Sequence, residues 1–265
     1  MRPLVSYYGG KQRIANKIIP YIPDHHCYVE PFCGGASILF AKPYISKNEV
    51  LNDKDEGIFN LYDVAIHNRE EFFEIVMDRA LFHEKFFRMS DSILKNPADH
   101  NKVEWAWACF YNIILSFSRR LQGGMGFSYT SNQSIVLKNR VLLLEKILDR
   151  LKRVQIFCRD GLEIIDMFDE DGAFFYLDPP YPDACQGHYA GYSIDDLRNL
   201  VERLRGIRGK FILSNYEHPE IEIPKDWRKV EISTFVSASM GKNRKVTEII
   251  YMNYQPDFLL FSLGS

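Results

Sequence analysis

Apolar positions along the chain switch between the spacing of buried strands and that of amphipathic helices. In the first 68 residues this pattern predicts a helix, a strand, a short helix, a strand and a helix, over residues 11–22, 27–32, 36–43, 49–53 and 53–68. Pro20 and Pro43 would end the first two helices. The third helix would begin on Asp53 or Asp55, because an acidic residue stabilises a helix N-terminus.

A long helical block follows. Apolar residues recur at helical spacing from Arg69 to about Ser118, as in EEFFEIVMDRALF and VEWAWACFYNIILSF. A glycine-rich, aromatic and polar stretch over residues 118–134 separates this block from another amphipathic helix over residues 139–153.

Beyond residue 153, strands and helices alternate again. Strands are predicted over residues 154–158, 173–177 and 210–215, and helices over residues 160–168 and 193–207. Two β-rich runs close the chain, over residues 227–239 and 246–254, and MGKNRK between them predicts a hairpin turn.

Alternation on both sides of a helical block indicates a doubly wound α/β sheet with an insertion. We place the sheet domain at residues 1–66 and 137–265, and the insertion at residues 67–136.

Composition adds few constraints. The chain has 46% hydrophobic and 26% charged residues and a net charge of −2, as in an ordinary globular protein. The N-terminus lacks the apolar stretch of a signal peptide, and no apolar run approaches the length of a membrane helix. Five cysteines include no CxxC pair, and the seven histidines show no ligand spacing. We therefore expect a cytoplasmic protein with reduced thiols, no membrane segment and no metal.

Charge is unevenly distributed along the chain. Residues 110–160 carry nine Lys and Arg against three Asp and Glu, whereas residues 53–104 carry seven against twelve. Such asymmetry can concentrate a positive potential on one face, although two helical segments with ordinary solvated surfaces would give the same counts.

A glycine turn and a distant acid indicate a cofactor site. Gly34 and Gly35 follow a predicted strand, and Asp53 ends the next strand, where an acid can accept hydrogen bonds from ribose hydroxyls. No GxGxxG is present, which argues against a pyrophosphate ligand. Glu30 just before the turn fits a cofactor with an ammonium group, such as an adenosine with a methionine tail.

The N-terminal SYYGGKQ supports the same interpretation. A tyrosine face can stack on an adenine or shield a sulfonium, and Lys11 can hold a carboxylate. A flexible helix entry with a solvated lysine is the simpler alternative.

The stretch AFFYLDPPY ends a buried strand with an acid. Pro179 and Pro180 have nearly fixed φ angles and lack N–H groups, so the Asp178 carboxylate and the Pro179 carbonyl form a rigid pair of acceptors. Tyr181 adds a flat aromatic face. This arrangement suits a planar amine such as adenine N6, because accepting both N–H hydrogens directs the nitrogen lone pair at an electrophile.

The motifs YYGGK, VEPFCGGAS, LND, LDPPY and ILSNYE occur in the order found in Dam-like N6-adenine DNA methyltransferases of the alpha arrangement, which the chain resembles over almost its whole length. The resemblance implies a Rossmann-like methyltransferase sheet with a C-terminal antiparallel hairpin and a mainly helical target-recognition insertion. It implies metal-independent methyl transfer from S-adenosylmethionine to an adenine flipped out of double-stranded DNA, with S-adenosylhomocysteine as product. One departure is Ala36, which stands where the family's FxGxG motif has its second glycine.

The resemblance also implies roles by position. The catalytic motif would be Asp178, Pro179, Pro180 and Tyr181. The cofactor contacts would be Tyr7, Lys11, Glu30, Phe32, Gly34, Asp53, Asp160 and Asp178.

Three segments are candidates for DNA contact. Arg119 and Arg120 lie in a loop with aromatic residues that could fill the gap left by a flipped base. Tyr189 lies in the segment after the DPPY motif. The predicted hairpin turn contributes Lys242, Asn243, Arg244 and Lys245, although solvated hairpin tips are often basic for no functional reason.

Other functions remain open at this point. An RNA adenine methyltransferase would use the same motif, because DPPY selects the amine and not the polymer. A catalytically silent DNA-binding protein could keep the fold. Glutamine and cytosine-N4 methyltransferases usually have Asn or Ser where Asp178 stands, and a nicotinamide oxidoreductase would need the missing GxGxxG. We expect a bacterial or phage-encoded monomer.

Overall fold

The computed structural model describes residues 1–7, 9–117, 119–127, 132–182, 192–215, 218–237 and 243–256. Seven strands form one mixed sheet in the order β3-β2-β1-β4-β5-β7-β6. The strands are β1 (Cys27–Glu30), β2 (Asn48–Asn52), β3 (Val154–Phe157), β4 (Ala173–Leu177), β5 (Lys210–Asn215), β6 (Arg228–Ser237) and β7 (Asn243–Met252).

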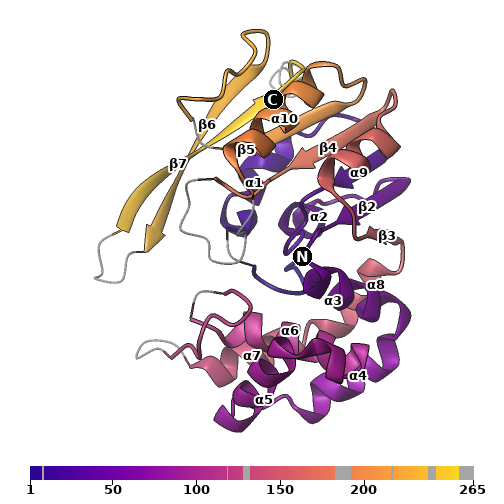
Figure 1. Cartoon of the computed structure of the whole chain (residues 1–265), viewed down its shortest axis with the longest axis vertical. Coiled ribbons are helices and arrows are strands. Elements are labelled where there is room, and N and C mark those ends of the chain that lie inside the picture. The colour runs from indigo at the N-terminus through magenta and orange to yellow at the C-terminus, as the bar shows by residue number, and fades with distance from the viewer. Residues whose placement is uncertain are drawn as a thin grey trace, which may run out of the picture. The chain divides into compact units, whose positions relative to one another are not determined.

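The sheet combines parallel and antiparallel pairs. β1 pairs with β4 and β4 with β5 in parallel, whereas β7 runs antiparallel to both β5 and β6. Figure 1 shows β6 and β7 as a long two-stranded ribbon. Chain order along the sheet reverses between β1 and β4, and ligands of open α/β sheets bind at such a point, beyond the carboxyl ends of the strands. The predicted doubly wound sheet with a C-terminal antiparallel hairpin is confirmed.

The helices and short 3-10 turns (η) follow the predicted alternation. They are η1 (Lys11–Arg13), α1 (Ala15–Ile18), η2 (Ile19–Tyr21), α2 (Ser37–Ala41), α3 (Glu56–His67), α4 (Arg69–Asp78), α5 (Glu84–Lys95), η3 (Pro97–Asp99), α6 (Lys102–Leu115), α7 (Gln133–Val141), α8 (Leu144–Leu151), α9 (Gly161–Phe168) and α10 (Ile194–Arg205).

Three helix predictions were wrong in their bounds. The helix expected over residues 11–22 is divided into η1, α1 and η2. The single helix expected over residues 139–153 is two helices. Asn132 caps α7 by accepting from the backbone N–H groups of Ser134 and Ile135, so α7 starts earlier than expected, and it ends at Val141. The buried apolar stripe from Leu144 to Leu151 belongs to the separate helix α8. The helical block over residues 69–118 is likewise divided into α4, α5 and α6.

The chain divides into two compact units, each assembled from separate segments. The first contains residues 1–12, 33–41 and 51–159, and the second contains residues 13–32, 42–50 and 160–265. In the first unit, α6 packs against α3, α4 and α5 (Figure 1), and every residue from Ala106 to Leu115 is buried. In the second unit, β1 and β4 are buried along their whole length.

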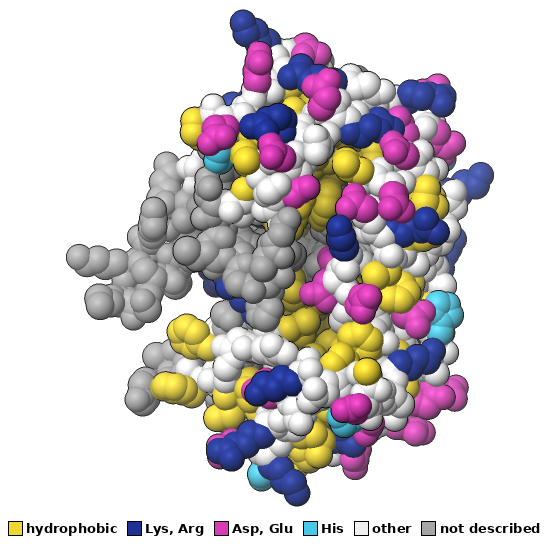
Figure 2. Space-filling view, viewed as in Figure 1, with side chains coloured by type: hydrophobic (Ala, Val, Ile, Leu, Met, Phe, Trp, Pro, Cys, Tyr) yellow, Lys and Arg dark blue, Asp and Glu magenta, His cyan; other side chains and the backbone are white. Residues whose placement is uncertain are grey.

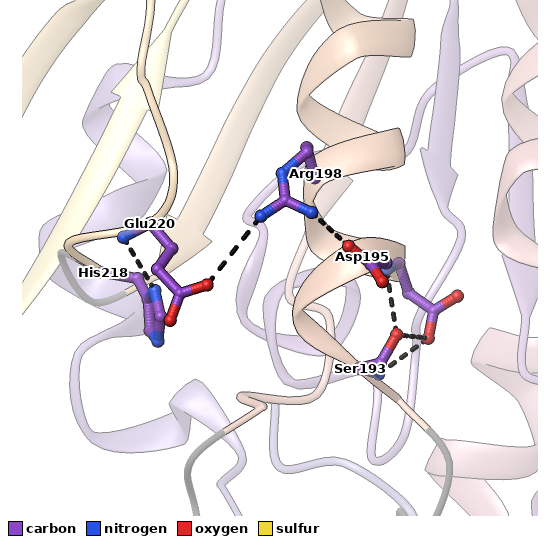
Figure 3. Close-up of polar contacts among 6 residues, drawn as sticks. Ser193, Asp195, Arg198, His218 and Glu220 are labelled. Carbon is purple, nitrogen blue, oxygen red and sulfur yellow. Dashed lines mark hydrogen bonds and ion pairs between the residues drawn. The ribbon is translucent and has the colours of Figure 1, made fainter.

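Local capping explains where two of the predicted helices begin. Asp55 caps α3 by accepting from two backbone N–H groups, which resolves the choice between Asp53 and Asp55. Ser193 and Asp196 cap α10 reciprocally, each side chain accepting from the other's backbone N–H. In the next turn, Arg198 pairs with Asp195 and with Glu220, which follows β5 (Figure 3).

Charged side chains of both signs are mixed on one face of the described structure. Lys and Arg side chains are interspersed with Asp and Glu on the described part of the face shown in Figure 2. Cys27, Cys33 and Cys109 are buried free thiols, whereas Cys158 is exposed. None of the helices in the described ranges is long and apolar enough to cross a membrane.

Candidate active site

In the first unit, the glycine turn and the predicted ribose acid are joined directly. The backbone N–H of Gly34 donates to the Asp53 carboxylate at 2.7 Å, and the N–H of Asp55 donates to its other oxygen at 3.0 Å. Ala36 has a φ of +50°, a left-handed conformation that costs an alanine roughly 1–2 kcal/mol. The turn therefore has a backbone conformation that favours glycine, although alanine stands at this position.

The carboxyl group of Asp53 has a raised pKa. Its side chain is 8% exposed, and burial raises its pKa from 3.8 to about 6, although the hydrogen bonds from Asp55 and Gly34 oppose the rise. Each carboxylate oxygen has two lone pairs, so an oxygen that accepts a backbone N–H retains capacity for a ligand hydroxyl.

The N-terminal motif packs onto the same turn. A Cβ atom added to Gly34 would lie 3.3 Å from Cδ1 of Tyr7, so the tyrosine ring lies against this glycine. Lys11 is buried, and its Nζ donates to the carbonyl of Gly9 at 3.2 Å. The buried guanidinium of Arg140 holds the segment by donating to the Pro3 carbonyl and, at 2.9 Å, to the Ser6 hydroxyl.

In the second unit, two predicted acids flank the point where the strand order reverses. Glu30 ends β1 and Asp178 follows β4. The two strands are parallel neighbours, and Val29 of β1 pairs with Phe175 of β4. Glu30 is buried, and its carboxylate accepts a hydrogen bond of 2.7 Å from the hydroxyl of Tyr28. This tyrosine was not among the predicted site residues.

The DPPY motif contacts Glu248, a further residue that was not among the predicted site residues. The Tyr181 hydroxyl lies 2.6 Å from Oε1 of Glu248 and 3.2 Å from Oδ1 of Asp178. The Ser214 hydroxyl donates to the same Glu248 oxygen at 2.8 Å. Burial raises the pKa of Tyr181 well above its ordinary value, and the charges of Asp178 and Glu248 raise it further. The only sequence signal for Glu248 is an acid inside the apolar run of β7.

A buried tyrosine also marks this edge of the sheet. The hydroxyl of Tyr176 is close enough to Asp178, Glu248 and Glu30 for all three charges to raise its pKa, after burial, which is the largest cause. Carboxylates from β1, from β7 and from the segment after β4 therefore act on the same hydroxyl.

Phe32 lies beside the start of α9. A Cβ atom added to Gly161 would lie 2.4 Å from Cζ of Phe32, so the ring packs directly on that glycine. Asp160 caps α9 by accepting from Leu162 at 3.0 Å. Tyr192 packs edge-on against Phe32 with ring centroids 6.2 Å apart, a neighbour that sequence reasoning did not identify.

Arg119 and Arg120, two candidates for DNA contact, lie in the loop after α6. Arg119 is half-buried and donates to the carbonyl of Ile114 at 2.9 Å, and burial lowers its pKa. The backbone N–H of Arg120 donates to the Ser116 hydroxyl at 3.0 Å, which fixes the loop to the end of α6. Nearby, Phe117 and Phe127 are 77% and 69% exposed.

The predicted hairpin turn over residues 240–245 was partly wrong. Asn243, Arg244 and Lys245 belong to β7, where they pair with Ser237, Val236 and Phe235, because backbone pairing in the ribbon continues past the β-rich sequence pattern. Lys242 and Tyr189 lie outside the described residues, as do the side chains of Asn243, Arg244 and Lys245.

In the part of the chain that the structure describes, no group of three His, Cys, Asp or Glu residues is arranged to hold a metal ion.

Comparison with known proteins identifies a family for the chain. A profile of the family described as D12 class N6 adenine-specific DNA methyltransferase matches residues 7–238. Type II methyltransferase M.MjaIII of Methanocaldococcus jannaschii is 24% identical, with 96% of this chain and 99% of the relative covered. Type II methyltransferase M1.LlaDCHI of Lactococcus lactis subsp. cremoris is 27% identical, and DNA adenine methylase of Escherichia coli K12 is 19% identical, each with 96% of both chains covered. The chain belongs to the D12 class of N6 adenine-specific DNA methyltransferases.

Proposed function

We propose that this enzyme methylates N6 of an adenine flipped out of double-stranded DNA, with Asp178 as the residue that accepts the amine. The observation that carries the proposal is the position of the DPPY motif. Asp178 follows β4 where the strand order reverses, and the buried Glu30 ends the neighbouring strand β1. A ligand of a doubly wound sheet binds there.

The residues of the second unit fit one part of S-adenosylmethionine. Glu30 is a buried carboxylate oriented by Tyr28, and it would hold the ammonium group of the methionine tail. The ring of Phe32 packs on Gly161 so closely that any side chain there would displace it, and it would contact the adenine ring of the cofactor. Asp160, at the start of α9, would accept from the adenine amine.

The cofactor roles of residues in the first unit rest on the order of the family's motifs. Asp53 would accept from ribose hydroxyls, because its buried oxygens retain lone pairs beyond those used by Gly34 and Asp55. Tyr7 lies on Gly34 and would shield the sulfonium, and Lys11 would pair with the methionine carboxylate. S-Adenosylmethionine, when bound, supplies an electrophilic methyl carbon on a positively charged sulfur, and S-adenosylhomocysteine would be the product.

The roles of the DPPY residues follow from the chemistry of the adenine amine. The N6 lone pair is delocalised into the ring, so the free base is a poor nucleophile. Asp178 and the Pro179 carbonyl would accept the two N–H hydrogens and direct the lone pair at the methyl carbon, with one N6 proton lost after the new C–N bond forms. Pro180 would fix the backbone, and the Tyr181 ring would stack on the flipped base.

Target recognition is assigned to residues 67–136. Phe117 and Phe127 are large exposed apolar side chains, and such residues can occupy the space that a flipped base leaves. Arg119 and Arg120 would contact phosphate or guanine from the same loop, and Tyr189 would contact the flipped nucleotide. Lys242, Asn243, Arg244 and Lys245 would contact the DNA backbone. We expect the enzyme to act as a monomer in the cytoplasm, without a metal.

One labelling experiment tests the proposal. The protein is incubated with methyl-labelled S-adenosylmethionine and equal amounts of duplex DNA, single-stranded DNA and RNA, in the presence of EDTA, and the labelled nucleoside is identified by mass spectrometry. We expect N6-methyladenine in duplex DNA. Label confined to RNA would contradict the choice of polymer, and DNA binding without any transfer would identify a catalytically silent relative.

A further inference from the structure

The hydroxyl of Tyr181 stands between two carboxylates. Its oxygen lies 2.6 Å from Oε1 of Glu248 and 3.2 Å from Oδ1 of Asp178. A phenol has one proton, so it can donate a strong hydrogen bond to only one of these oxygens at a time. The shorter distance is that of a charge-assisted O–H···O⁻ bond and identifies Glu248 as the acceptor.

Glu248 is itself fixed in place. It is 6% exposed, and Ser214 of β5 donates to the same Oε1 atom at 2.8 Å. β7 brings Glu248 to this point because it pairs antiparallel with β5, where Ser214 faces Ile250, two residues from Glu248. The hydroxyl groups of Tyr181, which follows β4, and of Ser214 in β5 therefore both lie within hydrogen-bonding distance of Oε1 of Glu248.

The phenol stays protonated in this setting. Burial and two neighbouring negative charges raise its pKa, so the proton is present at any physiological pH and is available to be donated. Which carboxylate receives this proton's hydrogen bond then matters for Asp178. If the phenol donated to Asp178, it would occupy an oxygen that the adenine amine is proposed to use.

We propose that Glu248 is a positioning residue for the methyl-transfer reaction. By accepting the phenolic proton, it fixes the ring of Tyr181 for stacking on the flipped adenine. It also keeps that proton off Asp178, so that the Asp178 carboxylate accepts from the adenine amine instead. This inference rests on the proposed role of Asp178 and extends it to a residue outside the DPPY motif.

The test is a double-mutant cycle on the single-turnover rate constant of methyl transfer to duplex DNA. Glu248→Gln keeps the size of the side chain but can donate to Tyr181, which would turn the phenolic proton toward Asp178. We expect a loss of about 10- to 100-fold, as for a lost hydrogen bond to a charged group. In the Tyr181→Phe background the same substitution should change the rate less than about twofold, because no phenolic proton remains to redirect.

Matched measurements separate this effect from a general loss of structure. Glu231→Gln, on the neighbouring strand β6 with a side chain 61% exposed, should leave the rate unchanged. The affinity for S-adenosylmethionine should be unchanged in the Glu248 variant, and its thermal midpoint is measured alongside. Should that variant fail to fold, Ser214→Ala removes the 2.8 Å bond to Glu248 and should lower the rate in the wild-type background, but not in the Tyr181→Phe background.

Three results would overturn the inference. These are a Glu248→Gln rate within twofold of wild type, an equal loss in both backgrounds, or an unchanged Ser214→Ala rate in a case where the glutamine variant does not fold. An inactive wild-type enzyme would instead contradict the proposed function, so the two failures are distinguishable.

Discussion

The backbone N–H of Gly34 donates a 2.7 Å hydrogen bond to the carboxylate of Asp53, 19 residues further along the chain. The glycine turn after β1 and the acid after β2 are therefore parts of one hydrogen-bonded structure. The same carboxylate accepts from Asp55, which caps α3. A change in the charge of Asp53 should consequently affect both the conformation of the turn and the start of this helix.

Asp53 should make the free enzyme less stable at alkaline pH. Its folded-state pKa of about 6 lies above the ordinary value of 3.8, so its contribution to stability is complete below pH 3.8 and is lost as the pH rises through 6. Between pH 5 and pH 8 the loss should be about 1.4 kcal/mol. Denaturant unfolding of the wild type and Asp53→Asn at both pH values measures it, because the variant lacks this titration. Parallel pH profiles would contradict the assigned pKa.

Ala36 should be a site where glycine is unusually well tolerated. Its φ of +50° is strained for alanine but not for glycine. Ala65 of α3 is a matched control, because it is equally buried but helical. Ala36→Gly should be about 1–2 kcal/mol less destabilising than Ala65→Gly in denaturant unfolding. Equal losses would show that the turn is not strained.

The buried pair of Lys42 and Glu49 should be sensitive to the loss of either partner. Their charged atoms are 3.0 Å apart, and the two side chains are 0% and 1% exposed. Lys42→Met should cost about 3–5 kcal/mol of unfolding free energy, since it leaves a buried carboxylate without its counter-charge, and Lys42→Met/Glu49→Leu should recover most of that loss.

An exposed pair in the same unit provides the control. Lys229→Met, which breaks a 3.3 Å pair with Glu231, should cost less than about 1 kcal/mol. A loss of similar size for Lys42→Met would mean that the buried pair contributes no more than the surface pair.

Gly161 should be intolerant of any side chain. A Cβ atom there would overlap Phe32 at 2.4 Å, so Gly161→Ala should displace the ring and, if Phe32 contacts the cofactor, weaken binding of S-adenosylmethionine by about 10-fold or more. Isothermal titration calorimetry measures this effect. Gly206→Ala at the end of α10 is the control, because nothing lies within 4 Å of its added Cβ. Wild-type affinity in Gly161→Ala would remove Phe32 from the proposed cofactor site.

Features encoded by neighbouring residues could be predicted from the sequence. The apolar run of residues 173–177 and the periodic pattern of residues 193–207 gave β4 and α10, and the position of Asp178 followed directly from the end of that strand. Asp55 was one of the two residues predicted to begin α3. This start could be predicted because a helix cap depends on side chains within one helical turn.

Contacts between distant residues could not be predicted in this way. Glu248 meets Tyr181 only because of the register between β7 and β5, and a register depends on pairing that no local pattern encodes. The strand character of Arg244 was missed for the same reason, because its pairing with Val236 extends β7 ahead of the strand predicted over residues 246–254.

The role of Asp178 is the central claim, and the single-turnover rate of methyl transfer by Asp178→Ala tests it most directly. With saturating S-adenosylmethionine and duplex DNA, the account predicts a rate at least about 10²–10³-fold below that of the wild type, as for loss of a group that stabilises the transition state. The variant should remain folded and should still bind DNA. A rate within a few-fold of the wild type would contradict the account.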